Sequence, residues 1–184
     1  SSFNVGKSYF GIQKSWIPIH EYAHPAQKII RDIEFLPEPG AFETHTIHKF
    51  LQPVVGTYGR DYIIVNYVNW SDSILSDAYC GDKTYLGHLG TDFVISGFQQ
   101  MDSSVYIQAV DSGVVTSIKD GLFDRETIAD TSKRLGNYVA LRHGDKYYTY
   151  YGHLKKNSIL VKPGDVVYPG QIIGEVGNWL RSRD

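Results

Sequence analysis

Short runs of β-branched and aromatic residues, each closed by a turn signal, constrain the fold of this 184-residue chain more than any other feature. They recur from Asp61 onward and are separated by Gly, Pro, Asp and Ser. Runs of this length and spacing are typical of an all-β protein. The predicted strands are Tyr62–Val68, Phe93–Ile95, Val105–Ile107, Val114–Ile118, Tyr138–His143, Tyr147–Tyr151, Ile159–Val161, Val166–Tyr168 and Ile172–Gly174.

Two of these runs flank a Gly144-Asp145 turn and predict a β-hairpin. The chain also carries 14 Tyr, 18 Gly and 7 Pro, which favour a sheet protein with many turns over a helical bundle. The sequence therefore predicts an antiparallel β-sandwich or a barrel-like sheet.

Residues 1–58 lack the dense strand signals of the rest of the chain and contain few glycines before Gly56. They predict an N-terminal extension that is partly helical or irregular and packs on a domain spanning 59–184. The best helix candidate is Pro25–Phe35, because proline suits the first helical position and three isoleucines follow near helical spacing. Pro37 and the residues after it would end that helix.

The charge balance excludes several classes of protein. Lys and Arg number 18 and Asp and Glu number 20, a net charge of -2 that argues against a nucleic-acid groove or a polybasic membrane anchor. No apolar run approaches the roughly 18–20 residues that a transmembrane helix needs. Because the chain starts with Ser1 and shows no signal-peptide pattern, we expect a processed or truncated product.

The cysteine and histidine counts restrict any metal site. The lone Cys80 excludes an intrachain disulfide framework and a cysteine-rich zinc knuckle. Since the chain has seven histidines, a metal site would have to be built mainly from His and carboxylate ligands.

The most informative segment is Tyr85–Phe93, in which His88 and Asp92 are four residues apart. Both side chains are zinc ligands in proteins. A fully extended chain would separate them by roughly 13 Å, so the segment must turn, and Gly87 and Gly90 supply the conformational freedom. Taken alone, this spacing is more often found around a structural histidine than in a metal site.

His153 follows the tyrosine-rich run Tyr147–Tyr151 and suits general acid–base chemistry, because the pKa of histidine lies near neutrality. Strand alternation predicts that Tyr147, Thr149, Tyr151 and His153 share one face. A half-exposed histidine at a strand end is the alternative interpretation. For His143, at the end of the preceding strand, we expect a structural role.

Seven short motifs follow one another along residues 58–178. They are Gly87–Phe93, Ala109–Val115, Gly136–Val139, Tyr151–Leu154, Val161–Val167, Gly170–Gly174 and Val176–Asn178. In this order they resemble the motifs of the lysostaphin/LytM-type zinc metallopeptidases, which are peptidoglycan endopeptidases. The resemblance covers about two-thirds of the chain and rests on the ordered set rather than on any one motif.

This resemblance implies a duplicated hybrid motif type of β fold, with His88 and Asp92 as ligands of Zn²⁺ and His153 as a catalytic histidine. In that family the metal polarises the scissile carbonyl and activates water, while the catalytic histidine orients the water or stabilises the oxyanion. The substrate it implies is the peptide of peptidoglycan. The protein would then be exported, to the periplasm, the cell surface or the extracellular space.

The family pattern breaks at the end of the chain. A final His-x-His segment, which carries the third zinc ligand, is expected soon after Asn178, but the sequence ends at Asp184 without another histidine. Three explanations stay open. The natural protein continues and the domain is C-terminally incomplete here, the chain is a degenerate and non-catalytic relative, or another histidine substitutes, with His45 and His48 as the candidates.

Two functions of different class follow. The first is a zinc-dependent endopeptidase that hydrolyses peptide cross-links of bacterial peptidoglycan. The second is a degenerate LytM-type domain that acts as a cell-wall-binding or protein-scaffolding module, with a protein partner. A lipoyl-like or sugar-phosphotransfer domain would fit the Pro-Gly-Asp and Gly-Gln turns but explains His88 and Asp92 less well.

Overall fold

The computed structural model describes residues 7–14, 50–71, 73–125, 135–144 and 147–178. Almost all regular structure in these ranges is antiparallel β, with one short helix, α2 (Phe98–Asp102). The strands are β1 (Lys7–Lys14), β2 (Ile63–Asn66), β3 (Thr91–Val94), β4 (Tyr106–Gln108), β5 (Gly113–Lys119), β6 (Tyr138–His143), β7 (Tyr147–Gly152), β8 (Val166–Val167) and β9 (Ile172–Glu175).

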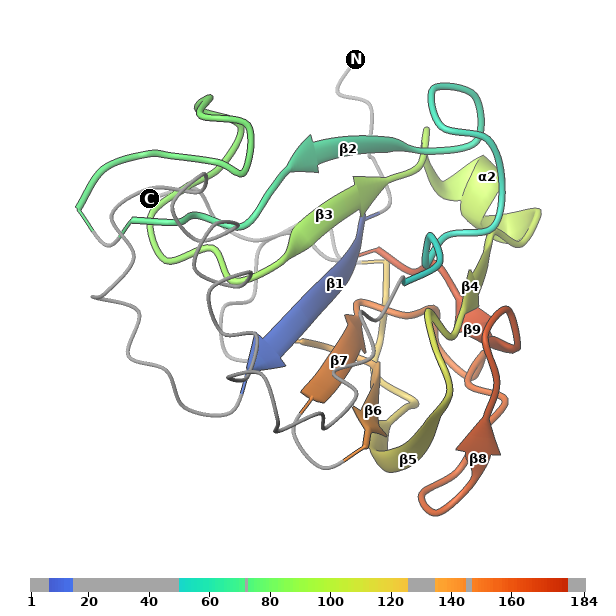
Figure 1. Ribbon diagram of the computed structural model, residues 1–184. Helices are drawn as coiled ribbons and strands as arrows, with labels where there is room; N and C mark the ends of the chain where they lie inside the picture. The colour runs from blue at the N-terminus through green and yellow to red at the C-terminus, as the bar shows by residue number, and fades with distance from the viewer. Residues whose placement is uncertain (1–6, 15–49, 72, 126–134, 145–146, 179–184) are drawn as a thin grey trace, which may run out of the picture.

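Seven of these strands form one sheet in the order β2-β3-β1-β7-β6-β5-β8, and β4 pairs with β9 in a second, smaller sheet (Figure 1). Because β2 and β8 are the edges of this strand order, the described sheet is open rather than a closed barrel. The prediction of an all-β, antiparallel fold is confirmed. No helix among the described residues has the length and apolar character needed to cross a membrane.

Most predicted strands form within one or two residues of their expected bounds. The hairpin is confirmed: β6 and β7 pair from His143–Tyr147 to Val139–Tyr151, and Gly144 in the turn has a φ of 58°. The prediction of a strand over Ile159–Val161 is wrong, because these residues do not form part of a strand. Helix α2 was not predicted, since its five residues are too few to establish a helical period.

Strand β1 comes from the region predicted as an N-terminal extension. It pairs with β3 through Lys7–Phe10 and with β7 through Tyr9–Lys14, so it connects two parts of the sheet that are far apart in sequence. The predicted helix over Pro25–Phe35 lies outside the described residues. The domain boundary at residue 58 stays a prediction.

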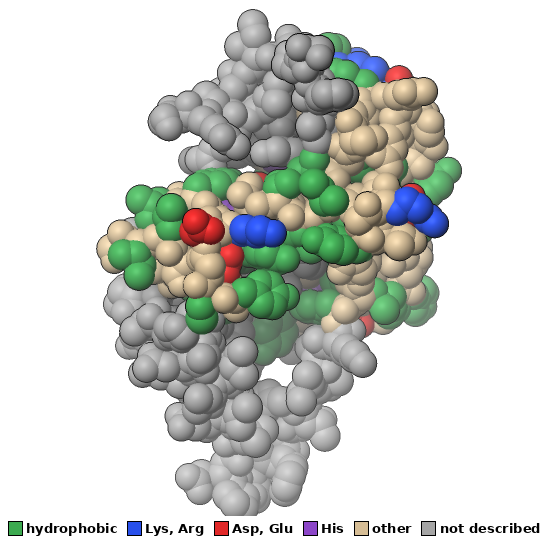
Figure 2. Space-filling view, turned by 90° about the horizontal axis from the view of Figure 1, so that it is seen from above, with side chains coloured by type: hydrophobic (Ala, Val, Ile, Leu, Met, Phe, Trp, Pro, Cys, Tyr) green, Lys and Arg blue, Asp and Glu red, His purple; other side chains and the backbone are tan. Residues whose placement is uncertain are grey.

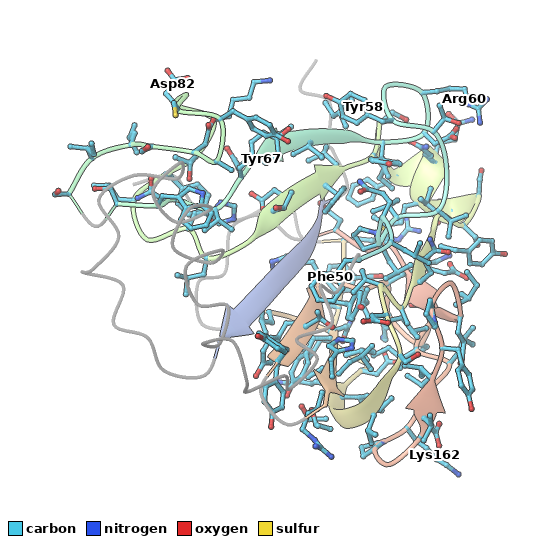
Figure 3. All side chains as sticks on the ribbon, viewed as in Figure 1. Phe50, Tyr58, Arg60, Tyr67, Asp82 and Lys162 are labelled. Atoms are coloured by element: carbon cyan, nitrogen blue, oxygen red, sulfur yellow. The ribbon has the colours of Figure 1, made fainter. Side chains whose placement is uncertain are left out.

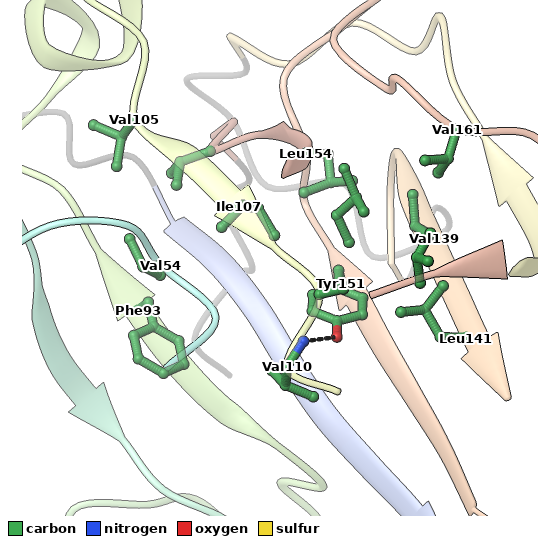
Figure 4. Close-up of a cluster of buried hydrophobic side chains, with 14 of the residues drawn as sticks. Val54, Phe93, Val105, Ile107, Val110, Val139, Leu141, Tyr151, Leu154 and Val161 are labelled. Atoms are coloured by element: carbon green, nitrogen blue, oxygen red, sulfur yellow. Dashed lines mark hydrogen bonds between the residues drawn. The ribbon is translucent and has the colours of Figure 1, made fainter. Parts of the chain in front are cut away.

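Buried side chains from both sheets form a single core (Figure 4). Tyr151 on β7 lies in it, with 1% of its surface exposed, and the backbone N–H of Val110 donates to its hydroxyl oxygen at 3.0 Å. Burial raises the pKa of Tyr151 to about 12. The other fully enclosed members include Val54, Ile95, Met101, Ile107, Val115, Val139, Leu141, Leu154, Val167 and Ile173.

A chain of polar contacts crosses this core beside Tyr151. His143, which is 1% exposed, donates from Nδ1 to the carbonyl of Ser112 at 2.7 Å, and its Nε2 lies 2.8 Å from the hydroxyl of Thr149. The Thr149 hydroxyl lies 3.3 Å from that of Tyr151. These contacts satisfy polar groups that would otherwise be costly to bury, as expected for a structural His143.

Replacing Tyr151 with phenylalanine tests this network. The change leaves the buried N–H of Val110 without its acceptor, so the free energy of unfolding should fall by about 1–3 kcal/mol in urea titrations. The matched control is Tyr150→Phe, which removes a hydroxyl from a half-buried tyrosine on the other face of β7. Equal effects of the two substitutions would contradict the assignment.

Candidate metal centre

The structure brings His88 and Asp92 into direct contact. His88 Nε2 lies 3.1 Å from Asp92 Oδ1, and the two residues are 2% and 7% exposed. The chain turns before His88, whose N–H donates to the carbonyl of Tyr85, and Gly87 has a φ of 73° in this turn. The predicted turn is therefore confirmed at Gly87, whereas Gly90 does not adopt a positive φ.

The backbone carbonyl of Tyr67 determines which nitrogen of His88 carries its proton. His88 Nδ1 lies 2.8 Å from this oxygen, and a carbonyl only accepts, so Nδ1 must be the donor. In the neutral ring Nε2 then presents its lone pair. Metal-binding histidines are commonly oriented in this way, with one nitrogen donating to a carbonyl and the other facing the metal.

Two acceptors therefore face each other across 3.1 Å, the lone pair of His88 Nε2 and the carboxylate oxygen Oδ1 of Asp92. They repel unless a proton or a metal ion lies between them. Nitrogen and oxygen ligands about 2.0–2.2 Å from a tetrahedral zinc are about 3.3–3.6 Å apart, slightly more than the 3.1 Å between His88 Nε2 and Asp92 Oδ1. The donor types and their spacing fit two positions of a zinc site.

The second oxygen of Asp92 is held by Asn66, whose Nδ2 donates to Oδ2 at 2.8 Å. Asn66 comes opposite Asp92 because β2 contains one extra residue. Ile64 pairs with Phe93 and Asn66 with Asp92, which leaves Val65 as a β-bulge. Without this bulge, regular pairing would place Val65 opposite Asp92.

The described residues between β2 and β3, 67–71 and 73–90, form a long loop that is held together by its own hydrogen bonds. The N–H of Tyr67 donates to Lys83, the hydroxyl of Thr84 donates back to the Tyr67 carbonyl, and the N–H of Asn69 donates to His88. The ring of Tyr85 stacks on His88 at 4.2 Å. Figure 3 places Tyr67 beside the loop segment that carries Asp82.

Asp77 organises the outer half of this loop and is 2% exposed. Its carboxylate accepts hydrogen bonds from the N–H groups of Tyr79, Gly81 and Lys83 at 2.8–3.0 Å. Burial alone would raise the pKa of Asp77, but these backbone hydrogen bonds and the charge of Lys83 lower it below its ordinary value. The loop that carries His88 is thus closed around a charged carboxylate.

His153 lies just after β7, in a turn that the backbone fixes from two sides. Its N–H donates to the carbonyl of Leu135, and the N–H of Leu154 donates to that of Asn137. The φ of His153 is 58°, a left-handed conformation that is rare for residues other than glycine. The predicted alternation therefore ends at Gly152: Thr149 and Tyr151 face the core, and the half-buried His153 does not continue their series.

Two further residues brace this turn. Asn137, 2% exposed, donates from Nδ2 to the carbonyls of Leu122 and Leu154, and its Oδ1 accepts from the N–H of Leu122. Gly177 packs so closely that a β-carbon there would lie 2.5 Å from the carbonyl of Leu154, and its N–H donates to His153. The motifs around Asn137, His153 and Gly177 thus meet in space.

The His88–Asp92 pair and His153 are related through β1. Tyr9 pairs with Asp92 on one side and with Gly152 on the other, so these two backbones lie two strand spacings apart, or about 10 Å. Within the described ranges no group of three His, Cys, Asp or Glu side chains is arranged to hold a metal, and His45 and His48 lie outside them.

Asn66 and Tyr67 were missed by sequence reasoning, which treated them as part of a predicted strand. Their roles depend on a bulge and on a loop that returns 21 residues later, and neither has a signal in the local sequence. The one available hint is a polar Asn in a run of β-branched and aromatic residues.

Comparison with known proteins shows what this chain is similar to. The family described as "Peptidase family M23" matches residues 86–183. Peptidoglycan DD-endopeptidase ShyA of Vibrio cholerae serotype O1 is 56% identical over 96 residues, which are 52% of this chain and 18% of that relative. No solved structure gives a significant match.

The bracing of His153 is tested by Gly177→Ala. The added methyl group overlaps the backbone of the turn, so the free energy of unfolding should fall by about 1–3 kcal/mol, and the amide of His153 should exchange faster with deuterium. Gly174→Ala is the matched control, because its β-carbon would be no closer than 3.4 Å to a neighbour. If Gly174→Ala lowers the free energy of unfolding as much as Gly177→Ala does, the role of Gly177 in holding this turn is contradicted.

The role of Asp77 predicts a pH dependence of stability. Because its pKa in the folded protein is below the ordinary value of 3.8, its stabilisation is complete above that pH and is lost as the pH falls through the folded pKa. Asp77→Asn should therefore lower the free energy of unfolding by about 1–3 kcal/mol at pH 6, and by less at pH 3, in urea titrations. Asp82→Asn, at an exposed position of the same loop, should have little effect at either pH.

Proposed function

Since the chain belongs to peptidase family M23, we propose that it acts as a zinc-dependent endopeptidase on the peptide cross-links of bacterial peptidoglycan. The family match supports a peptidase, and the similar protein from Vibrio cholerae is named for an endopeptidase activity on peptidoglycan. The match covers 18% of that relative, so its activity as a whole protein is carried over only as part of this proposal.

One observation supports the zinc dependence: His88 Nε2 and Asp92 Oδ1 face each other at 3.1 Å, while the carbonyl of Tyr67 accepts a hydrogen bond from His88 Nδ1. This arrangement of two buried acceptors favours a cation between them. Nitrogen and oxygen donors of this kind suit Zn²⁺. His88 and Asp92 are therefore the proposed protein ligands.

When bound, zinc would supply Lewis-acid polarisation of the scissile carbonyl and would lower the pKa of water. The carbonyl of Tyr67 orients the ring of His88, and the amide of Asn66 orients the carboxylate of Asp92, so both donor atoms are held in place. We assign to His153 the orientation of the attacking water or the stabilisation of the developing oxyanion, since a histidine can donate or accept a proton near neutral pH.

The surface around the edge strand β2, whose Asn66 contacts Asp92, suits a peptide better than a polyanion. Tyr58, Ile63 and Tyr79 are 58%, 45% and 76% exposed, and Ile63 belongs to the edge strand β2. Figure 2, seen from above, shows hydrophobic side chains with only a few charged ones between them on the described part of this face. Such a surface offers apolar contacts to an extended chain.

Two parts of the proposal extend beyond the described residues. A catalytic zinc site generally has three protein ligands, so a third must come from a part of the protein that the structure does not describe. In this chain His45 and His48 are the candidates. The substrate also requires an exported protein, in the periplasm, at the cell surface or outside the cell.

Metal analysis and hydrolysis of purified peptidoglycan test the proposal together. We expect about one zinc per chain, loss of hydrolysis on chelation, and recovery when zinc is restored. His88→Ala and Asp92→Ala should lose the metal and the activity. His153→Ala should keep the metal and hydrolyse cross-links about 10²–10⁴-fold more slowly.

The outcomes separate the alternatives. Zinc binding that survives replacement of both His88 and Asp92 would contradict the ligand assignment. A protein that binds peptidoglycan but neither binds zinc nor cleaves cross-links would be a non-catalytic cell-wall-binding or scaffolding module instead. Retention of zinc in His45→Ala/His48→Ala would exclude these two histidines as ligands.

A further inference from the structure

We infer that Asn66 is a positioning residue for Asp92: its side-chain amide holds the carboxylate in the orientation in which Oδ1 faces His88. The inference deepens the proposed function, because it concerns the same metal site. Nothing in the sequence motif His88–Asp92 points to Asn66, which lies 26 residues earlier in the chain.

The two oxygens of Asp92 have different partners. Oδ1 faces His88 Nε2 at 3.1 Å, whereas Oδ2 accepts from Asn66 Nδ2 at 2.8 Å. A carboxylate can rotate about its Cβ–Cγ bond, and this torsion is soft. A donor fixed on one oxygen stops the rotation and keeps the other oxygen on the side of His88.

The backbone makes this contact specific. Asn66 is placed opposite Asp92 by the bulge at Val65, and β-bulges of this kind often re-aim a side chain beside a functional site. The next residue, Tyr67, orients His88 through its carbonyl. Consecutive residues at the end of β2 therefore orient the two proposed ligands, one through a side chain and one through the backbone.

The chemistry of an amide suits this role. Asn66 donates an N–H without adding charge, so Asp92 keeps its full negative charge for a cation. Aspartate at position 66 would place a second acceptor against Oδ2, and leucine would fill a similar volume without donating. Partners of this kind around metal ligands typically change metal affinity by about 10–100-fold when they are removed.

The experiment compares the full chain with Asn66→Ala and Asn66→Leu. Zinc affinity, measured by competition with a chromophoric chelator, should fall by about 10–100-fold in both variants. Crystal structures of both variants without metal should show that Asp92 has left the orientation in which Oδ1 lies 3.1 Å from His88 Nε2. Because leucine retains the volume of asparagine, a loss in both variants assigns the effect to the hydrogen bond.

Gln100→Ala is the matched control. Its side-chain amide donates to the carbonyl of Asp61 and has no contact with Asp92, so it removes an amide hydrogen bond of similar type while leaving zinc affinity unchanged. Thermal unfolding of all variants without metal reports any general loss of stability.

Different results would contradict the role of Asn66 and the proposed zinc-dependent function. Zinc affinity within twofold of the parent in both Asn66 variants, or an Asp92 carboxylate that keeps its place in their structures, would overturn the role of Asn66. Absence of zinc binding in the parent chain would contradict the proposed function alone, because the structures without metal still decide whether Asn66 orients Asp92.

Discussion

The organisation of the candidate site depends on one backbone oxygen, the carbonyl of Tyr67. It accepts from the hydroxyl of Thr84 and from Nδ1 of His88, so both of its lone pairs are used by the returning arm of the loop between β2 and β3. The first contact closes the loop and the second selects the tautomer of His88. A carbonyl on the backbone cannot rotate away as a side chain can, and the orientation of the imidazole therefore follows from the fold itself.

The position of His153 is likewise fixed mainly by contacts of the backbone. Its turn is held by backbone hydrogen bonds to Leu135 and Gly177 and by the amide of Asn137, while none of these groups takes part in the proposed chemistry. Sequence motifs that look separate, around Asn137, His153 and Gly177, are thus parts of one support. Glycine is needed at 177 because any β-carbon there would overlap the backbone of Leu154.

Much of the fold follows from local patterns, and the rest depends on distant partners. Strands β6 and β7 were predicted almost residue for residue, because their β-branched and aromatic residues flank a turn with Gly144. Strand β1 gave no such signal, and its partners lie roughly 80 and 140 residues away. In the site, the spacing and the resemblance predicted that His88 and Asp92 come close together. The position of Asn66 could not be predicted, because it depends on the bulge at Val65, for which the local sequence has no signal. The catalytic role of His153 and the identity of the metal stay predictions.

The left-handed backbone of His153 has a consequence for how this position can vary. A residue with a β-carbon in this conformation costs about 1–2 kcal/mol relative to an ordinary one, and glycine would relieve that cost at once. Drift under selection for stability alone would therefore move position 153 toward glycine. The imidazole at this position goes against the conformational preference of its own backbone. This sets His153 apart from the buried His143, whose place packing and hydrogen bonding already explain.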